Sequence, residues 1–392
     1  MIGIVIGASS ESIHAINCAK KMGVYVVALD GNSEAEGLKI ADKCIVVDIK
    51  DRELVCDKIK NLNPTLTIPV PIGRYLTTTG YVNEYFNLKG IKGIASELCT
   101  DKYLFHKKLN ERGLRKNNVC LVKTSNDYIK QKFNYPIIVK PRYGSGSREV
   151  TLVSGRNELL EILGTKDELR EDFIIEEAIE GTEYGVDGAI LNGEVQITLL
   201  RKKIITKPPA RQCVGYISVN STEYNNELLK SVQNFLQCVI KEINMDNCIF
   251  HADLIINDND IFIIEISGRP SGHYLHNVFT PYVTDIDMIM EYIKYIKYGS
   301  GNFSPNQVKL SSIHYFNFEN CVIDYVPTLK ELTQDKKCNI KEFKCNIKPG
   351  DSLGMVNTGQ SVMGRGYFIV DGETEEVIIY QIDKVLNSFK FR

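Results

Sequence analysis

Two carboxylates lie in otherwise apolar runs in the second half of the sequence. Asp253 and Glu265 flank the polar segment 257–260, whose Asn and Asp residues favour a hairpin turn. If the hairpin is centred on Asn259, the two carboxylates are directly opposite each other, where like charges are destabilising unless a positive charge lies between them. A magnesium ion resolves this conflict, because Mg²⁺ is held by carboxylates together with substrate phosphates. The structural alternative is a carboxylate pair that is neutralised by Arg269 alone.

A lysine followed by a loop of small residues forms a second candidate site. The apolar run 136–139 ends in Lys140, and the loop that follows contains Gly144, Ser145, Gly146 and Ser147. Backbone N–H groups of such a loop can bind phosphate oxygens, while the lysine ammonium adds a positive charge. The spacing is not that of a Walker phosphate loop. A hairpin turn with a solvated lysine is the structural alternative.

A cluster of acidic residues follows the apolar run 173–175. It consists of Glu176, Glu177, Glu180 and Glu183, with a turn at Gly181. Carboxylates and free backbone groups around one cavity could accept hydrogen bonds from the amino group of adenine and from ribose hydroxyls. A solvated strand edge explains the same cluster when it is considered alone.

The first strand–helix turn argues against a dinucleotide site. Of the three glycines in the G-x-G-x-x-G fingerprint only Gly7 is present, and Asp30 ends the next strand. We therefore expect an ordinary turn and a strand-end acid, which disfavours a nicotinamide-dependent oxidoreductase.

Several other polar residues could serve a site or the fold. His273, shortly after Arg269, suits a substrate contact, a base or a hydrogen-bonded structural histidine. Arg74 follows a strand of the first sheet, at the edge where open α/β sheets bind ligands. A basic stretch could bind a substrate carboxylate or the nucleotide, but we expect a solvated strand face. It comprises Arg201, Lys202, Lys203, Lys207 and Arg211.

The elements that position these residues are typical of a multidomain protein with both α/β and α+β parts. In the first hundred residues short apolar strands alternate with helices, which predicts a parallel sheet covered on both faces. The strands are expected at 2–6, 24–29, 44–47 and 65–70, and the helices at 9–21 and 52–61. After about residue 96 the sequence is rich in strands, with helices expected at 102–112, 157–163, 226–243 and 374–387.

Composition limits the classes of function. The chain has 392 residues, 43% of them hydrophobic, and 47 basic against 49 acidic residues give a net charge of −2, so bulk electrostatic binding of nucleic acid is not expected. The 11 cysteines form no C-x-x-C pair, which favours reduced thiols in the cytoplasm. No apolar run of about 18 residues and no secretory signal is present, so we expect no membrane association.

These motifs, in this order, resemble the ATP-grasp superfamily of carboxylate–amine ligases, in its amino-acid-ligase and biotin-carboxylase branch. The resemblance covers nearly the whole chain. It implies an N-terminal parallel α/β domain at residues 1–98 and an ATP-grasp core at 99–300, in which two α+β subdomains clamp ATP. The lid subdomain would span about 115–180, and a strand-rich C-terminal lobe would follow at 301–392.

The resemblance also assigns roles to individual residues. The implied ATP-binding residues are Lys102, Lys140, Gly144, Ser145, Gly146, Ser147, Glu176, Glu177, Ile179 and Glu183. Asp253 and Glu265 would hold one or two Mg²⁺ ions, with Mn²⁺ as an alternative, and Arg269 would be catalytic with Lys140 and His273. Ser267 stands where the family commonly has a metal-binding Asn, and a hydroxyl can still bind Mg²⁺.

The chemistry implied by the resemblance is a two-step ligation. A substrate carboxylate attacks the γ-phosphate of ATP to give an acylphosphate and ADP, and an amine then displaces phosphate. We expect small-molecule carboxylate and amine substrates, the carboxylate being an amino acid. The alternatives are a bicarbonate-activating carboxylase, a purine-pathway ligase and a non-catalytic ATP-binding protein. Many members of the superfamily pair, so a homodimer is a further expectation.

Overall fold

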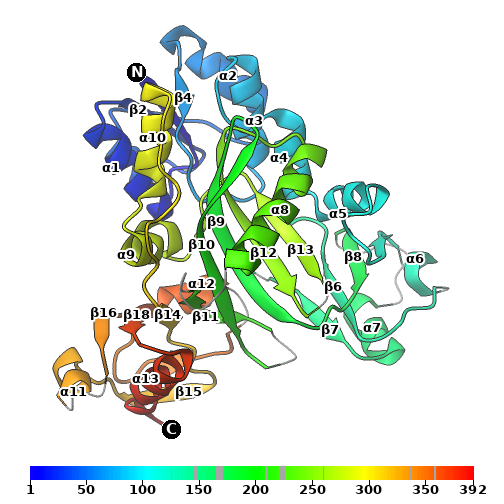
Figure 1. Cartoon of the computed structure of the whole chain (residues 1–392), viewed down its shortest axis with the longest axis vertical. Coiled ribbons are helices and arrows are strands. Elements are labelled where there is room, and N and C mark those ends of the chain that lie inside the picture. Colours follow the sequence, from blue (N-terminus) through cyan, green and yellow to red (C-terminus); the bar gives the residue numbers. More distant parts are fainter. Residues whose placement is uncertain are drawn as a thin grey trace. The chain divides into compact units, whose positions relative to one another are not determined.

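The chain is organised in two units, each assembled from separate segments, and its elements are labelled in the computed structural model of Figure 1. Unit 1 contains Met1–Asn117, Gly185–Leu200 and Asn225–Asn306, and unit 2 contains Asn118–Tyr184, Arg201–Tyr224 and Gln307–Arg392. The structure describes all residues except 125, 130, 145, 147, 165–170, 208–210, 220–225, 259, 335–337 and 357–358. Strands β9 (Thr182–Leu191) and β10 (Glu194–Ile205) contribute residues to both units.

Unit 1 begins with the predicted parallel sheet. Its strands are β1 (Ile2–Ile6), β2 (Tyr25–Asp30), β3 (Lys43–Val46) and β4 (Leu66–Thr67), in the order β3-β2-β1-β4. All of their pairings are parallel, as expected for short apolar strands separated by helices. The last strand is shorter than predicted, because Pro69 and Pro71 follow and cannot donate to a ladder.

Helices and short turns connect these strands. They are η1 (Ser10–Ser12), α1 (Ile13–Lys21), η2 (Glu36–Lys39), α2 (Arg52–Ile59), η3 (Lys60–Leu62), α3 (Leu76–Tyr85) and α4 (Gly93–Thr100). Successive side chains of β1 enter different apolar clusters, as the two-residue period of a strand requires. Val5 packs in a cluster with α1, whereas Ile4 and Ile6 pack with Val55 of α2 and Val82 of α3. The sheet is therefore covered on both faces.

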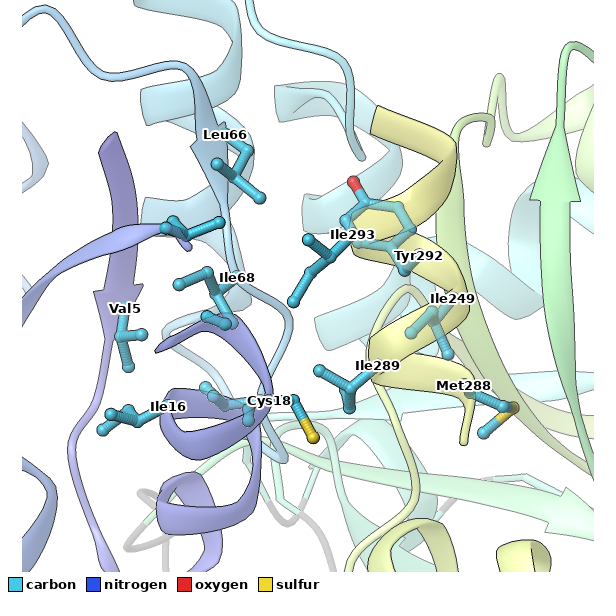
Figure 2. Close-up of a cluster of buried hydrophobic side chains, with 14 of the residues drawn as sticks. Val5, Ile16, Cys18, Leu66, Ile68, Ile249, Met288, Ile289, Tyr292 and Ile293 are labelled. Carbon is cyan, nitrogen blue, oxygen red and sulfur yellow. The ribbon is translucent and has the colours of Figure 1, made fainter. Parts of the chain in front are cut away.

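The rest of unit 1 combines helices with an antiparallel hairpin. The elements are α5 (Lys102–Glu111), α8 (Asn226–Glu242), β12 (Cys248–Ile256), β13 (Ile261–Ser267), the π-helical turn η4 (Leu275–Phe279), α9 (Thr280–Thr284) and α10 (Met288–Tyr298). Strand β12 lies between β9 and β13. Figure 2 shows α10 beside α1, and Ile289 and Ile293 belong to the same apolar cluster as Val5 and Ile16. The segment 286–293 thus supplies part of the core of the first sheet.

Unit 2 contains a four-stranded antiparallel sheet. Its strands are β5 (Val119–Val122), β8 (Phe173–Glu177), β6 (Ile137–Pro141) and β7 (Thr151–Val153), in the order β5-β8-β6-β7. Helices α6 (Asn126–Ile129) and α7 (Arg156–Leu163) accompany it, and Leu159 of α7 packs with Val139 and Ile175 of the sheet. Strand β6 thereby brings Lys140 to the end of a buried apolar run, as predicted.

The C-terminal residues complete unit 2. They form β14 (Ser311–Tyr315), β15 (Cys321–Tyr325), α11 (Leu329–Thr333), β16 (Ile340–Cys345), β17 (Ser352–Leu353), α12 (Gly359–Gly364), β18 (Gly366–Asp371), α13 (Glu375–Asn387) and β19 (Lys390–Phe391). Strands β10, β11 (Cys213–Ser218), β14, β18 and β16 are neighbours in that order. The predicted last helix is confirmed as α13, and the side chain of Thr374 caps it by accepting from the N–H of Val377.

The cysteines and the helices can be compared with the expectations of reduced thiols and of no membrane span. None of the 11 cysteines, all of which lie in the described ranges, forms a disulfide. No helix within those ranges has both the length and the apolar character needed to span a bilayer.

Acid should destabilise unit 2 through His314. This side chain on β14 is 3% exposed, and burial lowers its pKa to about 4. Between the unfolded pKa of about 6.5 and pH 4 only the unfolded chain takes up this proton, so stability falls as the pH drops, by up to about 3 kcal/mol. The variant His314→Leu should therefore lose less stability than wild type between pH 7 and pH 4.5, as measured by urea unfolding at a series of pH values.

The comparison at pH 7 is the control, because there the variant reports only its pH-independent packing cost. Two curves of stability against pH that run parallel over the whole range would contradict the assignment to His314.

Candidate active site

The hairpin β12–β13 brings the two predicted metal-binding carboxylates into register. Asp253 pairs with Glu265 across the strands. The ladder nearest the turn pairs Ile256 with Ile261, a register in which Asp253 would lie opposite Ile264 instead. A shift beside Asp253 leaves Ile264 outside the paired register, which is the mark of a β-bulge. The bulge therefore places two like charges opposite each other, an arrangement that is destabilising without a cation.

The backbone at the bulge is held by side chains from α5 and the segment after it. Nε2 of His106 lies 2.9 Å from the carbonyl oxygen of Ile264, and Nη1 of Arg115 donates to the carbonyl oxygen of Ile263 at 2.9 Å. Both His106 and Arg115 are buried. These contacts fix the shape of β13 at the carboxylate pair.

Helix α5 carries the first predicted ATP lysine. The carboxylate of Asp101 caps the helix by accepting from the N–H of Leu104 at 3.1 Å. Lys102 is the first residue of the helix and is half-buried. The same unit thus holds Lys102 and the carboxylate pair.

A buried histidine connects Asp253 to a second carboxylate. Nε2 of His251 lies 3.3 Å from Oδ1 of Asp253, and its Nδ1 lies 3.1 Å from Oδ1 of Asp187, which is fully buried. Asp187 also accepts from the hydroxyls of Ser271 at 2.9 Å and Thr280 at 3.3 Å. Burial disfavours a charged imidazole, but the Asp253 and Asp187 carboxylates outweigh it and raise the pKa of His251. His251, on the same strand, therefore fixes the orientation of the Asp253 carboxylate.

Sequence reasoning missed this histidine. Its signal was its position two residues before Asp253 on the same strand, because alternate residues of a strand share a face. Asp187, in contrast, comes from β9 and could not have been found from local spacing.

Arg269 begins the turn after β13. Gly268 precedes it, and a Cβ at that glycine would lie 2.4 Å from Cδ1 of Ile91, so no larger residue fits there without a shift. Nη1 of Arg269 donates to the carbonyl oxygen of Pro270 at 2.9 Å. Arg269, Gly268 and Asn83 help to line a cavity of about 20 Å³, the space of roughly one water. The arginine is therefore held in place by close backbone packing.

His273 lies in a strained backbone position next to the first sheet. Its φ is 59°, and its backbone N–H donates to Oε1 of Glu11 at 2.9 Å. Burial lowers the pKa of this imidazole, assisted by the nearby Arg269 charge and opposed by Glu11. A neutral imidazole fits either a substrate contact or a base. Ser267 is half-buried and pairs with His251 in the hairpin register.

Unit 2 brings two of the predicted ATP residues into direct contact. Nζ of Lys140 lies 2.5 Å from Oε1 of Glu176, and the two residues are only 3% and 8% exposed. The register pairs Lys140 with Ile174 and Glu176 with Ile138, so the ion pair runs diagonally across β6 and β8. The alternatives of a solvated lysine and of a solvated edge at Glu176 are wrong, because both charges are buried and paired.

The predicted ribose-binding glutamate is also held by cations. Oε1 of Glu183 accepts from Nη2 of Arg211 at 2.7 Å, and Oε2 lies 3.7 Å from Nζ of Lys203. The side chain of Glu183 is 16% exposed. This carboxylate is consequently fixed in orientation before any ligand is present.

The expectation of a solvated basic face is wrong for most of the stretch 201–211. Arg201 is fully buried, with its guanidinium 5.1 Å from the ring centroid of Tyr216. Lys202 forms an ion pair with Glu375 of α13 at 2.5 Å. Only Lys207 is exposed as expected. The reason is that β10 lies between β9 and β11, and its charged side chains have partners on these strands and on α13.

The glycine loop and the adenine segment are described in part. Ser145 and Ser147 lie outside the described residues, whereas Gly146 has a φ of 68°, a left-handed conformation that favours glycine. A Cβ at Gly144 or Gly146 would meet nothing within 4 Å. Glu177 and Ile179 are half-buried at the end of β8, and the intervening N–H of Ala178 already donates to Pro136.

The first strand–helix turn is structural, as expected. Oδ2 of Asp30 accepts from the N–H of Ala8 at 2.7 Å, and Oδ1 accepts from the N–H of Asn32 at 2.8 Å. A carboxylate engaged with the backbone in this way is a strand-end acid rather than a ribose ligand.

Residues 133–277 match the ATP-grasp domain family. This part of the chain is an ATP-grasp domain. Homologues with this domain are ATP-dependent, ADP-forming ligases that make carbon–nitrogen bonds, and enzymes of the ATP-grasp superfamily use ATP and Mg²⁺.

The proteins that this chain resembles differ in the substrates that their names give. A formate-dependent phosphoribosylglycinamide formyltransferase of Prochlorococcus marinus is 21% identical over 288 residues, 68% of this chain and 69% of the relative. A D-alanine–D-alanine ligase of Campylobacter concisus is 24% identical over 220 residues, 51% of this chain and 60% of the relative. The crystal structure of an L-amino acid ligase from Bacillus licheniformis superposes with a TM-score of 0.80 at 16% identity, covering 100% of this chain and 98% of that one. The structural likeness shows a shared fold.

Removing one partner of the Lys140–Glu176 pair should destabilise unit 2 strongly. Lys140→Met leaves the Glu176 carboxylate buried without the ammonium, which typically costs about 3–5 kcal/mol. The double variant Lys140→Met/Glu176→Leu should lose much less than the sum of the single changes, because no buried charge is then left over. Urea unfolding of the four proteins measures this coupling as a double-mutant cycle.

The pair Lys202–Glu375 is a matched control in the same unit. Its side chains are 34% and 30% exposed, so breaking it should cost at most about 1 kcal/mol. Additive effects at Lys140 and Glu176 would show that the two charges do not stabilise each other.

Proposed function

We propose that this ligase activates the carboxylate of an amino acid as an acylphosphate and joins it to an amine, with release of ADP and phosphate. The observation that carries the proposal is the opposed pair of Asp253 and Glu265, held in register by a bulge and followed by Arg269. Such a pair needs a cation, and the ATP-dependent ligases of this superfamily use Mg²⁺.

The carboxylate pair fits a magnesium ion. Its donors are oxygens, the type that Mg²⁺ prefers, and the same set would also accept Mn²⁺. We assign Asp253 and Glu265 as ligands and the Ser267 hydroxyl as a further ligand in place of the usual Asn. When bound, the ion would neutralise charge on the phosphate oxygens of ATP. His251 would keep the Asp253 carboxylate turned toward the ion.

We assign nucleotide binding to the residues that the sequence motifs single out. In unit 2, Lys140 would contact phosphate oxygens, and Glu176 would accept from the adenine amino group. Glu183, oriented by Arg211, would accept from ribose hydroxyls. The remaining assignments are Lys102 for the phosphates, the loop of Gly144, Ser145, Gly146 and Ser147 over them, and the backbone of Glu177 and Ile179 beside adenine.

The chemical steps then need positioning and charge stabilisation rather than a covalent enzyme intermediate. The planar guanidinium of Arg269 suits the acylphosphate and the tetrahedral species that follows attack by the amine. That amine must lose a proton as the new bond forms. The neutral imidazole of His273 is chemically able to accept it, which supports its assignment as a base.

The substrate class rests on two kinds of likeness. The L-amino acid ligase matches the fold over the whole chain, and a second relative is a D-alanine–D-alanine ligase, which favours an amino acid as the carboxylate. The formyltransferase relative, which covers 68% of this chain, favours a purine-pathway ligase as the second candidate. We further infer a cytoplasmic location, which the absence of disulfides among the 11 cysteines supports, and a homodimer, which a measurement of molecular mass in solution tests.

Incubation with ATP, Mg²⁺ and a panel of carboxylates should identify the substrate by the release of ADP. The panel contains single amino acids, pairs of amino acids, bicarbonate, and formate with glycinamide ribonucleotide. We expect release with amino acids, and release only with formate and the ribonucleotide would establish the second candidate. Formation of AMP and pyrophosphate would contradict an acylphosphate.

Glu265→Gln should lower the turnover in this assay by at least about 100-fold, because one charged ligand of the ion is lost. Exposed Glu194, in the same unit, offers the matched control Glu194→Gln, which should keep wild-type turnover. Unchanged turnover in Glu265→Gln would contradict the metal assignment.

A further inference from the structure

A second group of possible metal ligands lies in unit 1, away from the hairpin in sequence. His14 and Cys18 are one turn apart on α1, and Asp287 precedes α10. Nε2 of His14 lies 3.0 Å from Oδ2 of Asp287, and Sγ of Cys18 lies 3.4 Å from the same oxygen. Sγ of Cys18 and Nε2 of His14 are 3.5 Å apart. We name these three residues the α1–α10 cluster.

The three donor atoms form a closed triangle close to the size that a tetrahedral metal requires: both edges to sulfur, 3.4 and 3.5 Å, match, and the nitrogen–oxygen edge, 3.0 Å, is shorter. With metal–ligand bonds of about 2.0–2.3 Å, the edges of such a tetrahedron measure roughly 3.3–3.7 Å. Two sides of the triangle are contacts that His14 and Cys18 make with Asp287. The third side is the contact between the Cys18 sulfur and the His14 nitrogen, and a thiol forms only weak hydrogen bonds. Nitrogen, thiolate sulfur and carboxylate oxygen together are the donors of zinc sites.

The carboxylate is fixed in advance. Oδ1 of Asp287 accepts from the N–H groups of Ile289 and Met290 and so caps α10. With Oδ1 held by these two hydrogen bonds, the other oxygen of Asp287, Oδ2, points toward His14 and Cys18 of α1. Cys18 is held in place by the apolar packing of α1 against α10, and Figure 2 shows it between Ile16 and Ile289. The site therefore exists without a rearrangement of the backbone.

The cluster is open to solvent on one side and has a further histidine, His276, beside it. The side chains of His14 and Asp287 are each 26% exposed, which leaves an entry for an ion, while Cys18 is 4% exposed. The ring of His276 lies 5.8 Å from that of His14. Nδ1 of His276 is bonded to the carbonyl oxygen of Ser271, and its buried Nε2 has no hydrogen-bond partner among the described residues. This nitrogen is next to the cluster but is not one of its three grouped donor atoms.

We propose that His14, Cys18 and Asp287 form a site for a divalent transition metal, with zinc as the ion that suits this donor set. Binding would replace the thiol proton of Cys18, which is released to solvent, and no other bond is made or broken. The site would join α1 to α10 and is separate from the all-oxygen pair of Asp253 and Glu265.

Cobalt is the probe that distinguishes the two sites. The full-length protein is stripped of metal with a chelator, given excess Mg²⁺ to fill oxygen sites, and titrated with Co²⁺. We expect a thiolate-to-cobalt charge-transfer band in the near ultraviolet that saturates at one ion per chain and disappears on addition of Zn²⁺. An all-oxygen site cannot give this band.

Variants assign the band to the cluster. Cys18→Ser should abolish it, and His14→Gln should weaken Co²⁺ binding at least tenfold. Asp287→Asn should weaken binding similarly while still capping α10, so it remains informative if Cys18→Ser fails to fold. The exposed cysteines offer the matched controls Cys44→Ser and Cys238→Ser, which should keep the band. Absence of the band in the wild-type protein, or its persistence in Cys18→Ser, would overturn the proposal.

Discussion

The repulsion between Asp253 and Glu265 is the constraint on which the rest of unit 1 depends. Two carboxylates opposite each other on a hairpin cost free energy unless a cation is present, so a sheet selected for stability alone would not contain them. A bulge puts them there, and His106 holds the carbonyl group at the bulge. His251 contacts Asp253 on one side of the pair. A bound divalent ion between the oxygens would complete the balance.

The same principle, buried charge with a fixed partner, recurs in unit 2. Lys140 is almost fully buried and is neutralised by Glu176, and Glu183 is held by Arg211. Buried ion pairs are weak evidence of stability, because desolvation offsets most of the attraction between the charges. Their value here is geometric, since each pair fixes the orientation of a polar group. Under the proposed function, this is the preorganisation that phosphoryl transfer requires.

Features that depend on residues close together in the sequence could be predicted from it. The apolar alternation and the turn residues were enough for the pairing of Asp253 with Glu265 and for the strand that delivers Lys140. They were not enough for the bulge, because it is stabilised by contacts from α5 more than a hundred residues away in sequence. The basic stretch was misjudged for a related reason, since the burial of Arg201 depends on strands that the sequence does not place beside it.

A continuous chain of contacts connects the α1–α10 cluster with the carboxylate pair. His276, beside His14, is bonded to Ser271, whose hydroxyl donates to Asp187. Asp187 in turn holds His251, which contacts Asp253. Most groups in this series of contacts are buried, and Asp187 and His251 each have more than one hydrogen-bond partner in it. The residues that pack α1 against α10 are thus linked by direct contacts to the residues that orient Asp253.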